Sequence, residues 1–169
     1  MKTRFLLPAV LAAAALSGCQ KQADETAVAT EAPAEPAIVA QDCPVADESG
    51  RVDIAPGLSA TILKEGYGRA ATMGDYADVN AKLWVYDEAA DGGKGQFVWE
   101  SGDRPFQFQL GQSGLIDGWT MGIECMLVGE QRELIIASDL AYGESGRAPI
   151  PPNAAIIYDL ELQRLTTPE

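Results

Sequence analysis

The chain has 169 residues, of which 47% are hydrophobic, and this length and composition predict one compact domain with a sizeable core. Its formal net charge of −13 argues against a nucleic-acid-binding surface, which needs concentrated lysine and arginine. The sequence contains no histidine, so histidine-based triads, histidine metal sites and histidine general bases are excluded.

The N-terminus has the pattern of an export signal: two cations, an apolar run over residues 5–16, and small residues up to Cys19. The run is roughly a dozen residues and a membrane-spanning helix needs about 20, so a retained transmembrane helix is the weaker interpretation. The segment "LSGC" resembles the lipobox of bacterial lipoproteins, in which the cysteine is acylated after cleavage. We therefore expect a lipoprotein signal over residues 1–18 and lipidation of Cys19, with an ordinary secreted protein as the alternative. In such lipoproteins an aspartate after the cysteine favours inner-membrane retention, so Gln20 favours the outer membrane, facing the periplasm.

The next segment has the composition of a tether. Residues 20–41 are dominated by alanine, glutamate, threonine and proline, with no aromatic residue and no sustained apolar period. Such a segment cannot bury enough surface to order itself, and proline with acidic residues keeps it extended. We expect a disordered tether over residues 19–42 and a folded domain over residues 43–169, with its core at about residues 57–166.

Two further cysteines, Cys43 and Cys125, follow in a compartment where disulfides persist. With Cys19 carrying lipid, they form the one available pair. A bridge closing a loop of roughly 80 residues would stabilise the domain by about 4 kcal/mol on the chain-entropy model. The alternative is a pair of free, buried thiols.

Segments of period two begin near residue 57, as expected for half-buried strands. Apolar and polar side chains alternate in "GLSATILKEG" and in "DVNAKLWVY", and the face of the second segment that holds Ala81 is expected to point inward. An acidic, glycine-rich stretch, "DEAADGGKG", separates that strand from "QFVWES" and "PFQFQLG". The segments "QRELIIAS" and "AAIIYDLELQRL" are the last predicted strands.

One segment has the period of a helix. In "LIDGWTMGIECML", Ile116, Trp119, Ile123 and Met126 recur at steps of three and four residues. The predicted architecture is therefore α+β, an antiparallel sheet wrapped around one short helix. Between the last two strands lies "LAYGESGRAPIPPNA", whose three prolines predict a stiff loop that is either scaffolding or the wall of a binding site.

The order and spacing of these segments resemble the FKBP-type peptidyl-prolyl cis-trans isomerases. The resemblance rests on "GLSATILKEGYG" followed by "MGD", on "PFQFQLG", on "LIDGWTMGIECMLVGEQRELII" and on "LAYGESGRAPIPPNAAIIYDLELQRL", which together cover roughly two thirds of the chain. It implies a five-stranded antiparallel sheet curling around one α-helix, and an activity that needs no metal or cofactor.

The resemblance also implies a pocket for a substrate proline. Trp119 would form its floor, and Tyr142 at the rim would donate a hydrogen bond to a substrate carbonyl. Tyr158 stands where the family usually has phenylalanine. The remaining walls would be Phe106, Leu115, Ile116 and Ile150. For each aromatic residue, core packing alone is the competing interpretation.

The sequence departs from the family at two places. Ala81 stands where a strand tyrosine is usual, and "FVWES" replaces an "FDSS"-like segment. The second can be aligned so that Trp99 and Glu100 replace the phenylalanine and aspartate, or so that Val98 and Trp99 do. We favour the first, because it puts Phe97, Trp99 and Ser101 on one face and keeps an acidic group. In the family these two positions shape the carbonyl-binding side of the pocket, so the resemblance implies that Glu100 takes part in catalysis and that Trp99 and Ala81 contact the substrate. Arg147 then has Glu100 or Glu144 as a potential partner, with a solvated loop arginine as the alternative.

The sequence thus predicts a lipid-anchored peptidyl-prolyl isomerase of the cell envelope that accelerates folding of exported proteins, with activity reduced by the missing tyrosine. The expected partners are proline-containing envelope proteins and, through the anchor, the membrane. The acidic balance predicts monomers that repel one another. A catalytically weak chaperone or proline-peptide binding module is the alternative, and a purely structural envelope protein is a more remote one.

Overall fold

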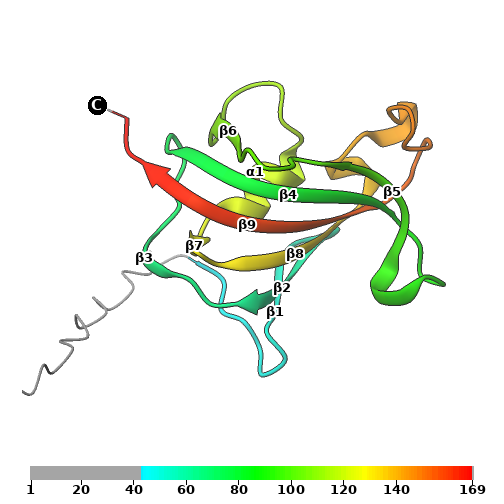
Figure 1. Cartoon of the computed structure of the whole chain (residues 1–169). Coiled ribbons are helices and arrows are strands. Elements are labelled where there is room, and N and C mark those ends of the chain that lie inside the picture. The colour runs from blue at the N-terminus through cyan, green and yellow to red at the C-terminus, as the bar shows by residue number, and fades with distance from the viewer. Residues whose placement is uncertain (1–42, 169) are drawn as a thin grey trace, which may run out of the picture. The chain divides into compact units, whose positions relative to one another are not determined.

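Alternating apolar side chains bring most of the folded chain into one antiparallel sheet (Figure 1). The computed structural model describes residues 43–168. The sheet has the strand order β1-β2-β8-β9-β4-β5, with β6 also paired to β4. Its strands are β1 (Arg51–Ala55), β2 (Leu58–Lys64), β4 (Tyr76–Tyr86), β5 (Lys94–Glu100), β6 (Phe106–Gln109), β8 (Gln131–Ile136) and β9 (Ile156–Thr166).

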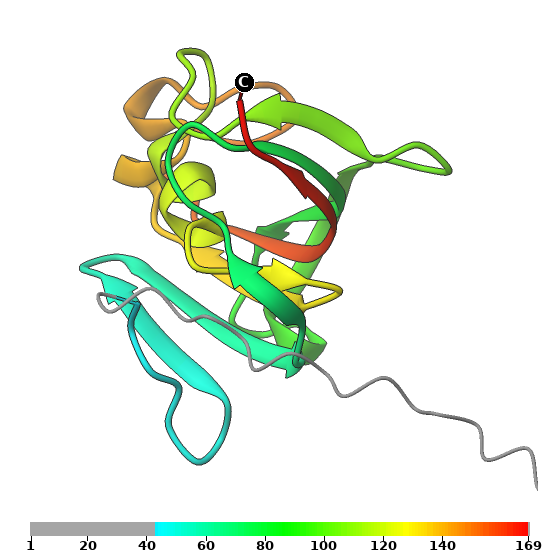
Figure 2. The ribbon, with the colours of Figure 1, turned by 90° about the vertical axis from the view of Figure 1, so that its left-hand side faces the viewer.

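The remaining elements are short. Strands β3 (Tyr67–Ala70) and β7 (Leu127–Val128) form a separate two-stranded sheet. Three 3₁₀ turns, η1 (Asp91–Gly93), η2 (Ser138–Leu140) and η3 (Gly143–Ser145), lie in the connections. The one α-helix among residues 43–168 is α1 (Asp117–Ile123), and Figure 2 shows it inside the curve of the sheet.

The fold class predicted from periodicity is confirmed, but the main sheet has seven strands where five were expected. One addition is β1, which pairs with β2 from Arg51↔Thr61 to Ala55↔Leu58. The other arises because the partner of β4 is divided: β5 pairs with its second half and β6 with its first half. The ladder is interrupted by the turn between them, residues 101–105, which ends at Pro105, a residue with no N–H to donate.

The centre of the sheet is the long pairing of β4 with β9. Every second residue of β4 from Ala77 to Leu83 is buried, and on β9 the same holds for the set Ile156, Tyr158, Leu160 and Leu162. The prediction that the Ala81 face points inward is confirmed. These residues share one core with Trp119, Ile123 and Met126, as the helical spacing predicted.

Two glycines let α1 lie unusually close to β8. A Cβ on Gly118 would overlap the side chain of Ile136, and a Cβ on Gly122 would overlap Leu134. Because glycine lacks that carbon, the helix backbone packs directly on the strand. The close approach at Gly118 fixes the distance between the sheet and the following residue, Trp119.

An ion pair between the half-exposed Arg69 and the buried Asp75 closes the turn before β4. Arg69 Nη1 lies 2.6 Å from Asp75 Oδ2, and the Thr72 amide donates to the same oxygen at 3.0 Å. Burial alone would raise the pKa of Asp75, but the hydrogen bonds from Arg69 and Thr72 outweigh it and hold the pKa below its usual range.

A second ion pair ties β8 to the end of the helix. Arg132 Nε donates to Glu130 Oε1 at 2.7 Å, and Arg132 Nη1 donates to the carbonyl of Gly122 at 3.0 Å. The Leu127 amide donates to the other Glu130 oxygen. An open helix carbonyl is thereby satisfied by a charged donor.

The first described residue, Cys43, is bonded covalently to a residue far along the chain. A disulfide joins Cys43 to Cys125, which lies two residues after α1 in a left-handed backbone conformation (φ 68°). The predicted signal over residues 1–18, the lipidated Cys19 and the tether over residues 19–42 lie outside the described residues. Within residues 43–168, no helix is long and apolar enough to cross a membrane, and His, Cys, Asp and Glu side chains form no group of three suited to a metal ion.

Candidate functional site

A cavity of about 450 Å³ opens where the start of α1 meets two loops. The loops are residues 110–116 and residues 138–153, which lie beside each other at the N-terminal end of the helix (Figures 1 and 2). Its lining combines both loops with residues of β4, β5, β6, α1 and β9. The lining residues are Leu83, Val98, Trp99, Phe106, Gly114, Leu115, Ile116, Trp119, Tyr142, Arg147, Ala148, Pro149, Ile150 and Tyr158.

Trp119 stands at the centre of an aromatic cluster at the base of this cavity. Its ring centroid is 4.8 Å from that of Tyr158, 5.7 Å from Phe108 and 6.1 Å from Phe106, all in edge-to-face arrangements. The residue is only 4% exposed, so its orientation is fixed by packing. Its Nε1–H has no hydrogen-bond partner among residues 43–168, which leaves a buried donor unsatisfied.

The loop that closes one side of the cavity is held by its own backbone. Arg147 and Ile150 exchange two hydrogen bonds of 3.0 and 2.6 Å, and the Asn153 amide donates to the Gly143 carbonyl at 2.9 Å. Gly146 has φ 62°, and a Cβ there would lie 2.7 Å from the Ile150 carbonyl, so a larger residue does not fit. The loop thus presents Ile150, 4% exposed, as a rigid wall.

Two polar side chains of the site, Tyr142 and Arg147, come from this same loop. The Arg147 guanidinium lies 5.9 Å from the centroid of the Tyr142 ring. Burial raises the pKa of the Tyr158 phenol well above its usual range, and the neighbouring Tyr142 adds to the effect while Arg147 opposes it. Tyr158 therefore keeps its proton, and the cavity stays uncharged apart from Arg147.

The opposite wall differs from the sequence-based expectation. The β4–β5 register shifts between Leu83↔Trp99 and Trp84↔Phe97, which is a β-bulge around Val98. Trp99 consequently packs towards the cavity, 6.4 Å from Phe106, whereas Phe97 packs on Trp84 outside the lining. The prediction that Phe97 and Trp99 share a face is wrong, because the bulge changes the phase of the alternation.

Two predicted site residues, Ala81 and Glu100, do not line the cavity. Ala81 is buried in the core, and its amide donates to Ser101 Oγ at 3.1 Å. Glu100 points outward and its carboxylate lies 3.7 Å from Lys82 Nζ, with both side chains half exposed. Within residues 43–168, Arg147 makes no ion pair with Glu100 or Glu144, so that predicted pairing is not formed.

The structure brings the other predicted pocket residues together. These are Trp99, Phe106, Leu115, Ile116, Trp119, Tyr142, Ile150 and Tyr158. Sequence reasoning did not place Leu83, Val98 or Gly114 in the lining, and it placed Arg147, Ala148 and Pro149 only as part of the stiff loop beside the site. Leu83 had a detectable signal, since it lies two residues after Ala81 on the same inward face.

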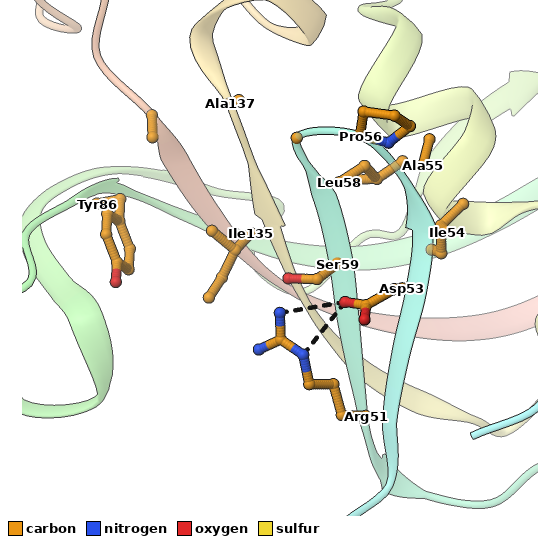
Figure 3. Close-up of a pocket in the computed structure, with 12 residues that line it drawn as sticks. Arg51, Asp53, Ile54, Ala55, Pro56, Leu58, Ser59, Tyr86, Ile135 and Ala137 are labelled. Atoms are coloured by element: carbon orange, nitrogen blue, oxygen red, sulfur yellow. Dashed lines mark hydrogen bonds and ion pairs between the residues drawn. The ribbon is translucent and has the colours of Figure 1, made fainter. Parts of the chain in front are cut away.

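A larger cavity of about 820 Å³ lies beside the β1–β2 hairpin (Figure 3). Its charged residues, Arg51 and Asp53, pair with each other at 3.1 Å and are largely exposed. Tyr86 is its one aromatic residue, and its lining has no buried polar atom without a partner among the described residues. The chemistry of a binding site is therefore concentrated in the smaller, apolar cavity.

Comparison with known families agrees with this geometry. A family model described as FKBP-type peptidyl-prolyl cis-trans isomerase matches residues 68–163, more than half of the chain. The chain belongs to the FKBP family.

Individual relatives show how far the similarity extends. FK506-binding protein 1 of Gibberella zeae is 34% identical over 111 residues, which are 64% of this chain and 98% of that protein. FK506-binding protein 4 of Dictyostelium discoideum is 52% identical over 59 residues, which are 34% of this chain and only 16% of that protein. In the crystal structure of FkpA from Escherichia coli, the similar region covers 72% of this chain and 54% of that one, with a TM-score of 0.61 and 31% identity.

The FKBP match includes every residue that lines the smaller cavity, whereas β1, β2 and the disulfide partner Cys43 precede it. The site is therefore built entirely within the FKBP-like part of the chain.

Proposed function

We propose that this protein is a peptidyl-prolyl cis-trans isomerase that uses the apolar cavity over Trp119 as its active site. Rotation about an X-Pro bond meets a barrier of about 18–20 kcal/mol, because twisting breaks the amide resonance. A twisted amide is less polar than a planar one, so a water-excluding apolar pocket favours the transition state over the ground state.

The observation that carries the proposal is the aromatic floor. Trp119 and Tyr158 pack edge to face at 4.8 Å, and Ile116 and Ile150 wall the same cavity. A flat indole held at 4% exposure is suited to packing against a pyrrolidine ring. The Tyr142 hydroxyl at the rim is the group that would donate to a substrate carbonyl.

Trp119→Ala and Tyr142→Phe test this proposal in an isomerase assay on an X-Pro peptide. Losing the packing surface at Trp119 removes about 1.5–3 kcal/mol of apolar contact, which corresponds to a loss of roughly ten- to a hundredfold in kcat/KM. Trp84→Ala is the matched control, because Trp84 lies outside the cavity lining and packs on Phe97. Wild-type rates from a folded Trp119→Ala variant would refute the proposal. Tyr142→Phe removes only the hydroxyl and creates no cavity, so wild-type rates from it would refute the proposed hydrogen bond to the substrate carbonyl.

A proline-peptide binding module is the second candidate. One observation favours it: the cavity lining contains no carboxylate, since Glu100 faces Lys82 and Ala81 supplies neither ring nor hydroxyl. Peptide binding that needs Trp119, without any rate enhancement in the wild type, would select this function over catalysis.

We further propose that the domain acts in the bacterial envelope, anchored through a lipid on Cys19 and held off the membrane by residues 19–42. The supporting observations are the "LSGC" segment, the composition of the tether and the disulfide at Cys43. The clients would be exported proteins with X-Pro bonds, and the net charge of −13 favours a monomer. Cys19→Ala is expected to move the protein from the membrane fraction to the soluble fraction, and unchanged membrane recovery would exclude the lipid anchor.

A further inference from the structure

Arg147 differs from every other residue of the proposed active site because it carries a charge. Of the residues that line the cavity in the described part of the chain, the others are apolar, aromatic or glycine. Arg147 stands on the rigid loop after η3, where its backbone is bonded in both directions to Ile150. Its guanidinium is held 5.9 Å from the Tyr142 ring, at the polar side of the entrance.

No carboxylate within residues 43–168 neutralises this arginine. Six of the other cations in residues 43–168 form ion pairs, among them Arg69 with Asp75, Arg132 with Glu130, and Lys94 with both Glu133 and Asp159. Lys64 and Arg104 form none, but neither of them lines the cavity. The sequence predicted Glu100 as a potential partner of Arg147. Its carboxylate instead lies 3.7 Å from Lys82 Nζ. In a chain with 25 acidic and 12 basic residues, a cation without a partner at a binding site is available to a ligand.

The electric field of Arg147 reaches the floor of the cavity. It favours the ionised form of the Tyr158 phenol, against the larger effect of burial on that pKa. Arg147 is itself exposed, so a negative charge brought to the entrance would be attracted to it with the modest strength of a solvent-accessible ion pair. The planar guanidinium also matches a carboxylate in geometry, with paired donors.

We propose that Arg147 makes this site selective for proline peptides that carry a carboxylate side chain directly next to the proline. The inference rests on the proposed function, because a proline ring placed on Trp119 leaves its flanking residues at the rim formed by Tyr142 and Arg147. The net charge of −13 opposes acidic peptides at long range. At physiological ionic strength that repulsion is screened over about 8 Å, so the contact with Arg147 decides the preference.

Matched peptides test this selectivity. Turnover is measured by NMR exchange and affinity by calorimetry, on peptides in which the residue before or after proline is Glu or its neutral isostere Gln. With a partly exposed ion pair, we expect the wild type to favour Glu over Gln by about two- to fivefold at one or both positions. The ratio should fall towards one in Arg147→Gln and below one in Arg147→Glu. Arg164→Gln, the same change at an arginine whose side chain is 73% exposed and outside the cavity, should leave the ratio unchanged.

The outcomes separate this inference from the proposed function. Turnover with equal rates for Glu and Gln peptides at both positions overturns the selectivity and leaves the isomerase intact. Binding that favours Glu without any turnover supports the selectivity and rejects catalysis. A preference that persists in Arg147→Gln assigns the effect to another group and overturns the inference, as does a protein that neither binds nor turns over any of the peptides.

Discussion

Gly118→Ala is expected to impair activity more than stability. A Cβ at this position would overlap the Ile136 side chain and lie 3.1 Å from the Leu140 carbonyl oxygen. Ile136 is fully buried and the oxygen belongs to the backbone, so neither can move aside without displacing the core. The helix must shift away from β8, and Trp119, the next residue, must shift with it.

The magnitudes follow from two opposing terms. Overpacking of a buried site costs about 1–3 kcal/mol, whereas replacing a helical glycine with alanine returns about 1 kcal/mol of helix propensity. The net loss in the free energy of unfolding is therefore about 0–2 kcal/mol. A displacement of Trp119 by about 1 Å lowers the rate by up to roughly a hundredfold, since catalysis depends on the placement of the packing surface.

Urea unfolding and the isomerase assay measure these two effects, and a double-mutant cycle identifies their origin. Ile136→Ala alone should cost about 2–5 kcal/mol, because it leaves a cavity beside the helix. With Gly118→Ala added, the new methyl group occupies part of that cavity, so the double variant should lose less than the sum by roughly 1 kcal/mol. Additive losses, or wild-type activity in Gly118→Ala, would refute the close-approach reasoning.

Two further predictions concern stability. Asp75→Asn should lower the free energy of unfolding by about 1–3 kcal/mol at pH 7, because the buried carboxylate loses its charge-assisted hydrogen bonds with Arg69 and Thr72. The pKa of Asp75 in the folded state is depressed, so its contribution to stability is present at pH values above its ordinary pKa of about 4 and is lost as the pH falls through the folded-state pKa. In a pH series of urea melts, the difference in unfolding free energy between the variant and the wild type should therefore shrink in acid. A difference that stays constant would contradict this. Replacing Cys43 and Cys125 by serine should cost about 4 kcal/mol, given the sequence separation of 82 residues, and equal melts with and without reductant in the wild type would argue against the bridge.

The elements with a strong local period could be predicted from the sequence. The spacing of Ile116, Trp119 and Ile123 predicted the helix, because all its large apolar residues face one core. Strands β4 and β9 were equally clear, since each keeps one face fully buried over many residues. Strand β1 is less visible, because its alternation covers five residues and buries only Val52.

The parts that escaped prediction depend on contacts between distant segments. The bulge at Val98 is a property of the β4–β5 pairing, and no feature of "FVWES" alone reveals it. The outward direction of Glu100 and the entry of Leu83 and Val98 into the cavity follow from the paired register. That Arg147 has no ion-pair partner within residues 43–168 likewise depends on where each neighbouring carboxylate lies.

The disulfide at the start of the domain also decides how the domain bears mechanical load. Strand β1 is the edge of the main sheet, and tension applied to the chain before it would otherwise peel it from β2 one hydrogen bond at a time. Because Cys43 is bonded to Cys125, a pull on the preceding residues is transmitted to the end of α1. The cavity lies at the opposite end of this helix, which is about 10 Å long. The end of α1 that bears the tension is thus separate from the end that lines the ligand cavity.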